Sequence, residues 1–507
     1  MPSTEGTPPL AESGPPVQDD PTAHRRRLGG AARGGAVLAY GSFAVSKLLV
    51  FVTTLILARM LTPGDFGVVG YALVVIGYLD AARDLGVGAA LIARPQVDRR
   101  VASTAFQISV GWGLLLTTAV FLGAPLLGDF FDDPRAVGVT QALSFGFLLS
   151  TLGSTHGALL YRELAFGRRV VPDVVEALVK VLVSIGLALG GWGYWSLVVG
   201  QLAGSASFCL TTWVMHPFRP RLEWDGAAGR WLLGFGSTVV ASSLLWGLLT
   251  SVSFLIVGRE LGAVALGIYL LAYRLPQLAL MSNYSILSTV LFPVYARLQG
   301  DLDGLRRGYL LGQRYMALVM IPAALGLAVV SPLFVSVFYG PAWVLAGPIM
   351  QIIAVRCAIG AIGWHASDIA KALGRARLHL ILVVIPVVIL VPSLLVAGRL
   401  FGLVGLALVY AAGALISTVL RTFLVRHVMG LSAIAALRAL EPALIVALAV
   451  VVASQGFLLL SQDWPDLARL IGATVLGGAA YLGALYLVGP DLMALLPARF
   501  RPRRATH

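Results

Sequence analysis

Residues 36–61 read AVLAYGSFAVSKLLVFVTTLILARML, an apolar run in which Lys47 is the only charge before Arg59. A helix of about 20 apolar residues crosses the roughly 30 Å hydrocarbon core of a bilayer. The run has no obvious small-residue cleavage site of the kind that ends a signal peptide. We therefore predict that it forms a first transmembrane helix.

The whole chain has the composition of a membrane protein. Its 507 residues are 58% hydrophobic and only 12% charged, and the mean hydropathy is +0.87. A soluble domain carries about 25% charged residues, so a soluble enzyme and a DNA-binding factor are excluded. The net charge of +13 comes from basic residues in short connections between apolar runs, where they orient the chain in the membrane rather than bind nucleic acid.

Comparable apolar runs recur along the chain, and about fourteen of them reach the length of a membrane span. We therefore predict an all-α, polytopic membrane protein with about fourteen transmembrane helices, arranged as two six-helix lobes plus two extra helices. The predicted spans lie near residues 36–60, 68–93, 101–126, 137–160, 170–190, 194–216, 231–257, 267–294, 309–330, 346–370, 379–398, 402–424, 441–461 and 468–489.

Polar stretches divide these spans into segments. The first stretch is rich in Pro, Ser, Gly and acids, a composition that cannot bury a core. The predicted segments are a disordered cytoplasmic tail (1–35), an N-lobe (36–216), a cytoplasmic linker between the lobes (217–230), a C-lobe (231–425), two further spans (441–489) and a basic cytoplasmic tail (490–507).

The basic residues also predict the orientation of the chain. Most of the 37 Lys and Arg residues fall in connections on the same side as the amino terminus. Short connections rich in Lys and Arg stay in the cytoplasm. We therefore expect a multi-pass protein of the plasma (inner) membrane with both termini in the cytoplasm.

An internal repeat relates the two lobes. The pattern Arg59-x-Leu61-x5-Gly67 after the first span recurs as Arg259-x-Leu261-x5-Gly267 after the seventh, 200 residues later. Because six spans separate the two copies, both lobes have the same topology and are related by an axis along the membrane normal. Repeats of this kind are typical of transporters.

Catalytic motifs are absent where a membrane enzyme would need them. The sequence contains no Walker A pattern, no HExxH and no serine centred in GxSxG. We therefore expect neither an enzyme nor a bound cofactor, and no metal site is predicted.

Charged residues inside the spans are the candidate functional residues. Each costs about 2.5–3.5 kcal/mol at the centre of a membrane helix, so it tends to face a cavity or a partner. Four cations are candidate ligands for a phosphate-bearing substrate, namely Lys47, Arg83, Lys180 and Arg274. Five acids are candidate cavity or ion-coupling residues, namely Asp80, Asp84, Asp173, Glu176 and Asp368. The tenth span also contains Arg356 and His365.

Several of these charges also have a structural interpretation. Glu176 and Lys180 stand at i,i+4 and can neutralise one another. Asp80 stands at i,i+3 from Arg83 and at i,i+4 from Asp84 on one helical face, so Arg83 has two carboxylates within reach. Asp368 lies close to the cytoplasmic Lys371, and Arg274 can extend to the outer interface. If the cations instead share one chamber between the lobes, the chamber suits a phosphate-bearing substrate, because Arg and Lys both bind phosphate oxygens.

Five short motifs resemble the bacterial polysaccharide-biosynthesis flippases of the multidrug/oligosaccharidyl-lipid/polysaccharide exporter superfamily. The resemblance extends over roughly residues 36–425. Its motifs are LARMLTPGDFG (57–67), DLGVG (84–88), YRELAFGRR (161–169), VGRELG (257–262) and FPVYAR (292–297).

The resemblance implies two six-helix lobes plus two helices, and a substrate that is an oligosaccharide on a polyprenyl diphosphate carrier, moved to the outer leaflet. In the related lipid II flippases, functional cations lie in the first, second and eighth spans. Here Lys47, Arg83 and Arg274 lie in those spans. The expected partners are membrane lipids, the lipid-linked glycan and glycan assembly enzymes.

Other functions stay open at this point. A cation-coupled multidrug exporter of the same fold would favour carboxylates in its chamber. A polyprenyl-linked glycosyltransferase would need a larger outer loop than this chain has, and a scaffold for glycan assembly is a further alternative. Coupling of transport to Na⁺ or H⁺ is also open.

Overall fold

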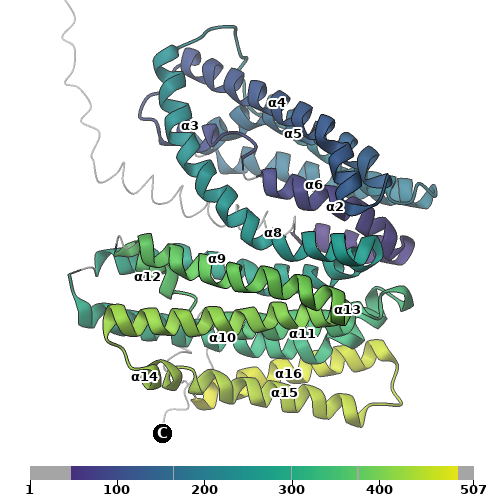
Figure 1. Ribbon diagram of the computed structural model, residues 1–507, viewed down its shortest axis with the longest axis vertical. Coiled ribbons are helices and arrows are strands. Elements are labelled where there is room, and N and C mark those ends of the chain that lie inside the picture. Colours follow the sequence, from purple (N-terminus) through teal and green to yellow (C-terminus); the bar gives the residue numbers. More distant parts are fainter. Residues whose placement is uncertain (1–46, 81, 164, 299, 374–375, 489–507) are drawn as a thin grey trace, which may run out of the picture.

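The computed structural model describes residues 47–80, 82–163, 165–298, 300–373 and 376–488. These residues form helices and short connections, with no β-strand among them. Figure 1 shows two bodies of helices, with α2, α4, α5 and α6 in one and α9, α10, α11 and α13 in the other. Helix α8 runs between the two bodies. Helices α15 and α16 pack on the far side of α10.

The first body contains the helices of the predicted N-lobe. Helix α2 begins at Pro63, a residue that suits the first turn of a helix because its missing N–H would have no partner there. The Asp98 carboxylate accepts a hydrogen bond from the Val101 N–H and so caps α4. The helices are residues 47–60, α2 (Pro63–Asp80), α3 (Val87–Ala93), α4 (Arg99–Phe131), α5 (Arg135–Arg162), α6 (Phe166–Leu189) and α7 (Trp195–Met215).

The second body continues from α8. Two glycines with positive φ, Gly262 (φ 79°) and Gly402 (φ 63°), make tight turns between consecutive spans inside α8 and α13. The elements are α8 (Gly226–Pro276), the π-helix η1 (Gln277–Met281), α9 (Ser282–Arg297), α10 (Leu302–Phe338), the 3₁₀ turn η2 (Pro341–Trp343), α11 (Ala346–Gly360), α12 (Ala366–Ala372), α13 (Ala376–Met429), α14 (Ala433–Arg438), α15 (Glu441–Leu460) and α16 (Asp466–Val488).

The all-α membrane fold predicted from the sequence is confirmed, and the helices are compatible with the predicted number of spans. Among the described residues, 8 helices are long and apolar enough to cross a membrane. Helix α8 already begins at Gly226, inside the predicted linker, because the Asp225 carboxylate caps the N–H groups of Ala227 and Ala228. The tails predicted at 1–35 and 490–507 lie outside the described residues.

The two copies of the repeat contact each other. A Cβ atom added to Gly67 would lie 1.8 Å from the carbonyl oxygen of Ala263, and one added to Gly267 would lie 1.9 Å from that of Pro63. Residues 63 and 67 correspond to residues 263 and 267 in the repeat, so the contact is reciprocal. We call this close approach of α2 and the second half of α8 the glycine crossing.

The repeated arginines stabilise the same end of the molecule. Arg59 donates from Nε to the Phe338 carbonyl oxygen at 2.8 Å and also to Val337. Arg259 donates to the carbonyl oxygens of Asp129 and Phe130. These carbonyls end α10 and α4, where helices have unpaired acceptors and partial negative charge. Each arginine therefore caps a helix of the opposite lobe.

The connection between the lobes packs against the other end of α4. Arg100 donates to the Trp224 carbonyl oxygen at 2.9 Å, and the Thr104 hydroxyl accepts from the Asp225 N–H at 2.9 Å. His156 of α5 lies 3.1 Å from the Phe218 carbonyl oxygen. The predicted linker is thus held on the N-lobe. It packs at the start of α4, a helix about 50 Å long, and the glycine crossing lies near the other end of α4.

We predict that Gly67→Leu separates α2 from α8. The neighbouring atom is a backbone oxygen that cannot rotate away, so the change should lower the free energy of unfolding by about 1–3 kcal/mol. Thermal unfolding of the purified protein in detergent measures the loss. The matched control is Gly77→Leu in the same helix, because a Cβ at Gly77 meets nothing within 4 Å. Equal stability of the Gly67→Leu and Gly77→Leu variants would contradict the close packing of α2 against α8 at Gly67.

Candidate functional site

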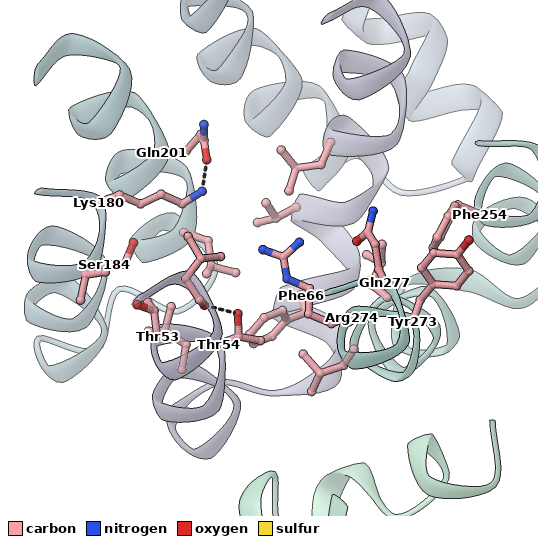
Figure 2. A pocket seen from close by; sticks show the side chains of 18 residues that line it. Thr53, Thr54, Phe66, Lys180, Ser184, Gln201, Phe254, Tyr273, Arg274 and Gln277 are labelled. Carbon is pink, nitrogen blue, oxygen red and sulfur yellow. Dashed lines mark hydrogen bonds between the residues drawn. The ribbon is translucent and has the colours of Figure 1, made fainter. Parts of the chain in front are cut away.

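A cavity of about 350 Å³ lies between the N-lobe and the second half of α8 (Figure 2). Its walls come from residues 47–60, α2, α6, α7, α8 and η1, and we call it the chamber. Most of its lining is apolar. The polar side chains that line it are Thr53, Thr54, Lys180, Ser184, Gln201, Tyr273, Arg274 and Gln277. Two predicted cations, Lys180 and Arg274, are thus brought to one cavity.

Lys180 is held by the packing of α6 against α7. Gly200 and Gly204 have no side chain, and a Cβ at Gly200 would lie 1.8 Å from the Ser184 hydroxyl oxygen. This close approach brings Gln201 to Lys180, whose Nζ donates a hydrogen bond to the Gln201 side-chain oxygen (Figure 2). The ammonium group therefore has a neutral partner at the chamber wall.

Arg274 enters the chamber from the other side. It lies in the last turn of α8, before Pro276 and the π-helix η1. Figure 2 shows its guanidinium directed between the helices that surround the chamber. No carboxylate of the described residues lies within ion-pair distance of Arg274, and the phenol of Tyr339 lies nearby. Arg274 also repels Lys180 across the chamber.

Lys47 stands at the start of the described chain. Its side chain is exposed and is not among the lining residues. It is close enough to Arg274 for the two charges to repel each other. Its predicted role as a diphosphate ligand stays a prediction.

The structure departs from the prediction at Arg83. The predicted second span is not one continuous helix, because α2 ends at Asp80 and a turn with Leu85 and Gly86 at positive φ precedes α3. Arg83 pairs with Asp80 at 3.3 Å, and both side chains are about half exposed. Asp84 instead accepts hydrogen bonds from the N–H groups of Gly86 and Gly88. None of the three charged residues lines the chamber.

Two predicted acids lie along α6 below the chamber. Asp173 forms an ion pair with Arg169 at 2.6 Å. Glu176 precedes Lys180 by one helical turn and interacts electrostatically with it and with Arg83. Neither acid is among the lining residues.

Asp368 lies in the C-lobe, away from the chamber. The tenth predicted span is broken between α11 and α12, and Gln313 fills the break by accepting from the Gly363 N–H at 2.8 Å. Asp368 is 7% exposed. It accepts a hydrogen bond from the Ser288 hydroxyl at 2.8 Å, and Lys371 Nζ lies 4.0 Å away. The carboxylate is therefore buried within the protein.

Two further observations complete the site. Within the described ranges, no group of three or more His, Cys, Asp or Glu side chains could hold a metal ion. The neutral polar residues that line the chamber, among them Gln201 and Gln277, were not predicted from the sequence. The one feature of the sequence that could have identified these two glutamines is their position as amides inside apolar spans.

Comparisons with known proteins place this geometry in context. The sequence profile of a family described as polysaccharide biosynthesis protein matches residues 56–348. The lipopolysaccharide biosynthesis protein WzxC of Escherichia coli (strain K12) is 28% identical over 384 residues, which are 74% of this chain and 77% of that protein. The teichuronic acid biosynthesis protein TuaB of Bacillus subtilis (strain 168) is 25% identical over 420 residues, with 82% and 86% of the chains covered. The succinoglycan biosynthesis transport protein ExoT of Rhizobium meliloti (strain 1021) is 25% identical over 312 residues, or 61% of this chain and 62% of ExoT.

Solved structures share the fold at low sequence identity. The lipid II flippase MurJ in an inward closed conformation superposes with a TM-score of 0.72 and 15% identity, covering 90% of this chain and 100% of that chain. An inward-facing multidrug resistance MATE transporter superposes with a TM-score of 0.65 and 16% identity, covering 77% of this chain and 98% of the transporter. An outward-facing MATE transporter superposes with a TM-score of 0.52 and 14% identity, covering 79% of this chain and 95% of the transporter. The superposition is thus closer for the inward structures than for the outward-facing one.

We predict that Gln201→Leu destabilises the protein through Lys180. The change leaves a buried ammonium without its hydrogen-bond acceptor, at a cost of about 1–3 kcal/mol in the free energy of unfolding. Adding Lys180→Met should recover most of this loss, because the unpaired charge is then gone. Thermal unfolding of the two single variants and the double variant forms the cycle. Losses that simply add would show that the two side chains do not depend on each other.

Proposed function

The chain belongs to the polysaccharide biosynthesis protein family, and we propose that it moves a polyprenyl-diphosphate-linked oligosaccharide across the plasma membrane by alternating access. The product would serve cell-surface polysaccharide biosynthesis. One observation carries the proposal: among the described residues, the chamber is lined by two cations, Lys180 and Arg274, and by no Asp or Glu.

A cavity with this charge favours an anionic ligand. Within the membrane, a chamber with two positive groups and no lining carboxylate has a strong positive field, because the low dielectric weakens screening. A diphosphate carries negative charge on both phosphates, so one can face Lys180 while the other faces Arg274. The arginine can bind two phosphate oxygens at once and the lysine acts as a point charge.

The volume of the chamber indicates which part of the substrate it holds. Pockets for drug-sized ligands measure about 300–1,000 Å³, and the chamber, at about 350 Å³, is at the small end. It can accept a diphosphate headgroup with little of the attached glycan. A complete oligosaccharide therefore needs the lobes to move apart, while the polyprenyl tail stays in the surrounding lipid.

The glycine crossing supplies a place where this movement begins. Given the predicted orientation, with both termini in the cytoplasm, the crossing closes the outer side of the chamber. The Arg59 and Arg259 caps join the lobes at the same side. Rocking of the two lobes would break these contacts and open the chamber outward, as alternating access requires.

The lining also argues against the alternative substrate class. A multidrug exporter of this fold would attract cationic drugs with carboxylates in its chamber. Glu176 stands one helical turn from Lys180 and is not among the lining residues. We therefore propose the lipid-linked anion rather than a cationic drug as the substrate.

The remaining assignments are part of the same proposal. We propose that the protein transports its substrate without a catalytic step, in line with the transport named for ExoT. Glycan assembly enzymes on the cytoplasmic side would supply the lipid-linked glycan. If Na⁺ or H⁺ drives the cycle, Asp368 is our candidate for the coupling residue, because its carboxylate is buried and accepts a hydrogen bond from the Ser288 hydroxyl.

We predict that the double variant Lys180→Ala, Arg274→Ala loses export of the lipid-linked glycan at least tenfold, since both charged contacts to the diphosphate are removed. The measurement is the amount of glycan that reaches the cell surface, normalised to the protein found in the membrane. Arg83→Ala is the matched control, because Arg83 pairs with Asp80 outside the chamber. It should retain export.

Two results would count against this proposal. Normal surface glycan in the double variant would remove the role of the chamber cations. If cells with the double variant lost resistance to cationic dyes while their surface glycan was unchanged, the result would favour a multidrug exporter instead.

A further inference from the structure

A third cation, Arg356, lies inside the C-lobe and outside the chamber lining. It is on α11, and its guanidinium stacks 4.1 Å from the ring centroid of Tyr410 on α13. Tyr269 and Tyr273 of α8 are its other close aromatic neighbours. We call these four residues, with Ser253 beside Tyr269, the Arg356 cluster.

The cluster contains polar atoms that nothing in the described protein satisfies. The Arg356 Nε, the Tyr269 hydroxyl and the Ser253 hydroxyl are all buried and have no hydrogen-bond partner. Tyr269 and Ser253 are 0% and 1% exposed. The Tyr269 and Ser253 hydroxyls lie close to each other. Buried polar groups are almost always hydrogen-bonded, so three such atoms in one cluster indicate a missing ligand.

The cluster also carries an uncompensated charge. The titratable side chains around Arg356 are the phenols of Tyr410, Tyr273 and Tyr269, the Cys357 thiol and a second cation, Arg421. Among the described residues, no carboxylate forms an ion pair with Arg356. The Tyr410 ring face offsets part of the positive charge. A buried charge without an opposite charge is unfavourable. A water molecule would satisfy the hydrogen bonds but leave this charge in place, whereas an anion would do both.

We propose that the Arg356 cluster binds one small monovalent anion, and we identify it as chloride. The Arg356 Nε–H and the hydroxyls of Tyr269 and Ser253 would donate to it, and a monatomic anion needs only donors. Tyr410 and Tyr273 form the walls. Since Tyr273 also lines the chamber, the bound anion stabilises the C-lobe core directly behind the chamber wall. This site is separate from the proposed diphosphate site and does not depend on it.

The test uses the purified full-length protein in detergent. Thermal unfolding is measured in potassium gluconate as bromide replaces gluconate at constant ionic strength. The wild type should show a saturable rise in its unfolding midpoint, because bromide binds the folded state. Tyr269→Phe and Ser253→Ala each remove one donor with little change in shape. Each should raise the half-saturating bromide concentration about tenfold, and Arg356→Met should abolish the response.

The control is Tyr295→Phe, which removes another buried hydroxyl that lacks a partner but lies in a different core cluster. It should keep the wild-type response to bromide. Crystals grown in bromide should show an anomalous peak within hydrogen-bonding distance of Arg356 Nε and the Tyr269 hydroxyl. The proposal is overturned if no such peak is found, or if Tyr269→Phe and Ser253→Ala respond to bromide as the wild type does. Water would then occupy the cluster.

Discussion

The backbone contact between Gly67 and Gly267 and the opposite lobe is the constraint on which the rest of the structure depends. At both positions a Cβ would overlap a carbonyl oxygen, so the two helices meet only because neither residue has a side chain. The contact also determines the chamber. Phe66 precedes Gly67, Val69 follows it by two residues, Leu270 and Leu271 follow Gly267, and all four line the chamber. Residues next to the crossing therefore form part of the wall of the cavity that Lys180 and Arg274 line.

Two sets of positively charged side chains lie near this crossing, one in the chamber and one at the crossing itself. In the chamber, the two cations are kept without a lining carboxylate, which is costly for the empty protein and favourable once an anionic headgroup enters. At the crossing, Arg59 and Arg259 bind helix ends of the opposite lobe. The arginines of the repeat thus hold the lobes together, whereas in our proposal the chamber cations attract the substrate. In that proposal, opening the crossing would break the arginine contacts while the chamber cations hold the diphosphate.

Much of this could be predicted from the sequence, for physical reasons. Long apolar runs predicted the helices, and the repeat at Arg59 and Arg259 predicted two lobes of one topology. Lys180 and Arg274 could be found because a charge inside a span needs a cavity or a partner. Arg83 was placed wrongly in a continuous helix, since hydropathy does not reveal the turn at Leu85 and Gly86. Gln201 was missed because a neutral amide in a span costs too little to be conspicuous.

The most direct measurement is a reversible cross-link across the crossing. A Cβ at Gly64 would lie 3.8 Å from a side-chain carbon of Val264, so cysteines introduced at both positions, with Cys209 and Cys357 replaced by alanine, should form a disulfide. We expect the oxidised protein to bind the lipid-linked substrate without moving it to the outer leaflet, and transport to resume on reduction. Transport at the normal rate with the disulfide intact would contradict the account, because the crossing would then not be the point at which the chamber opens.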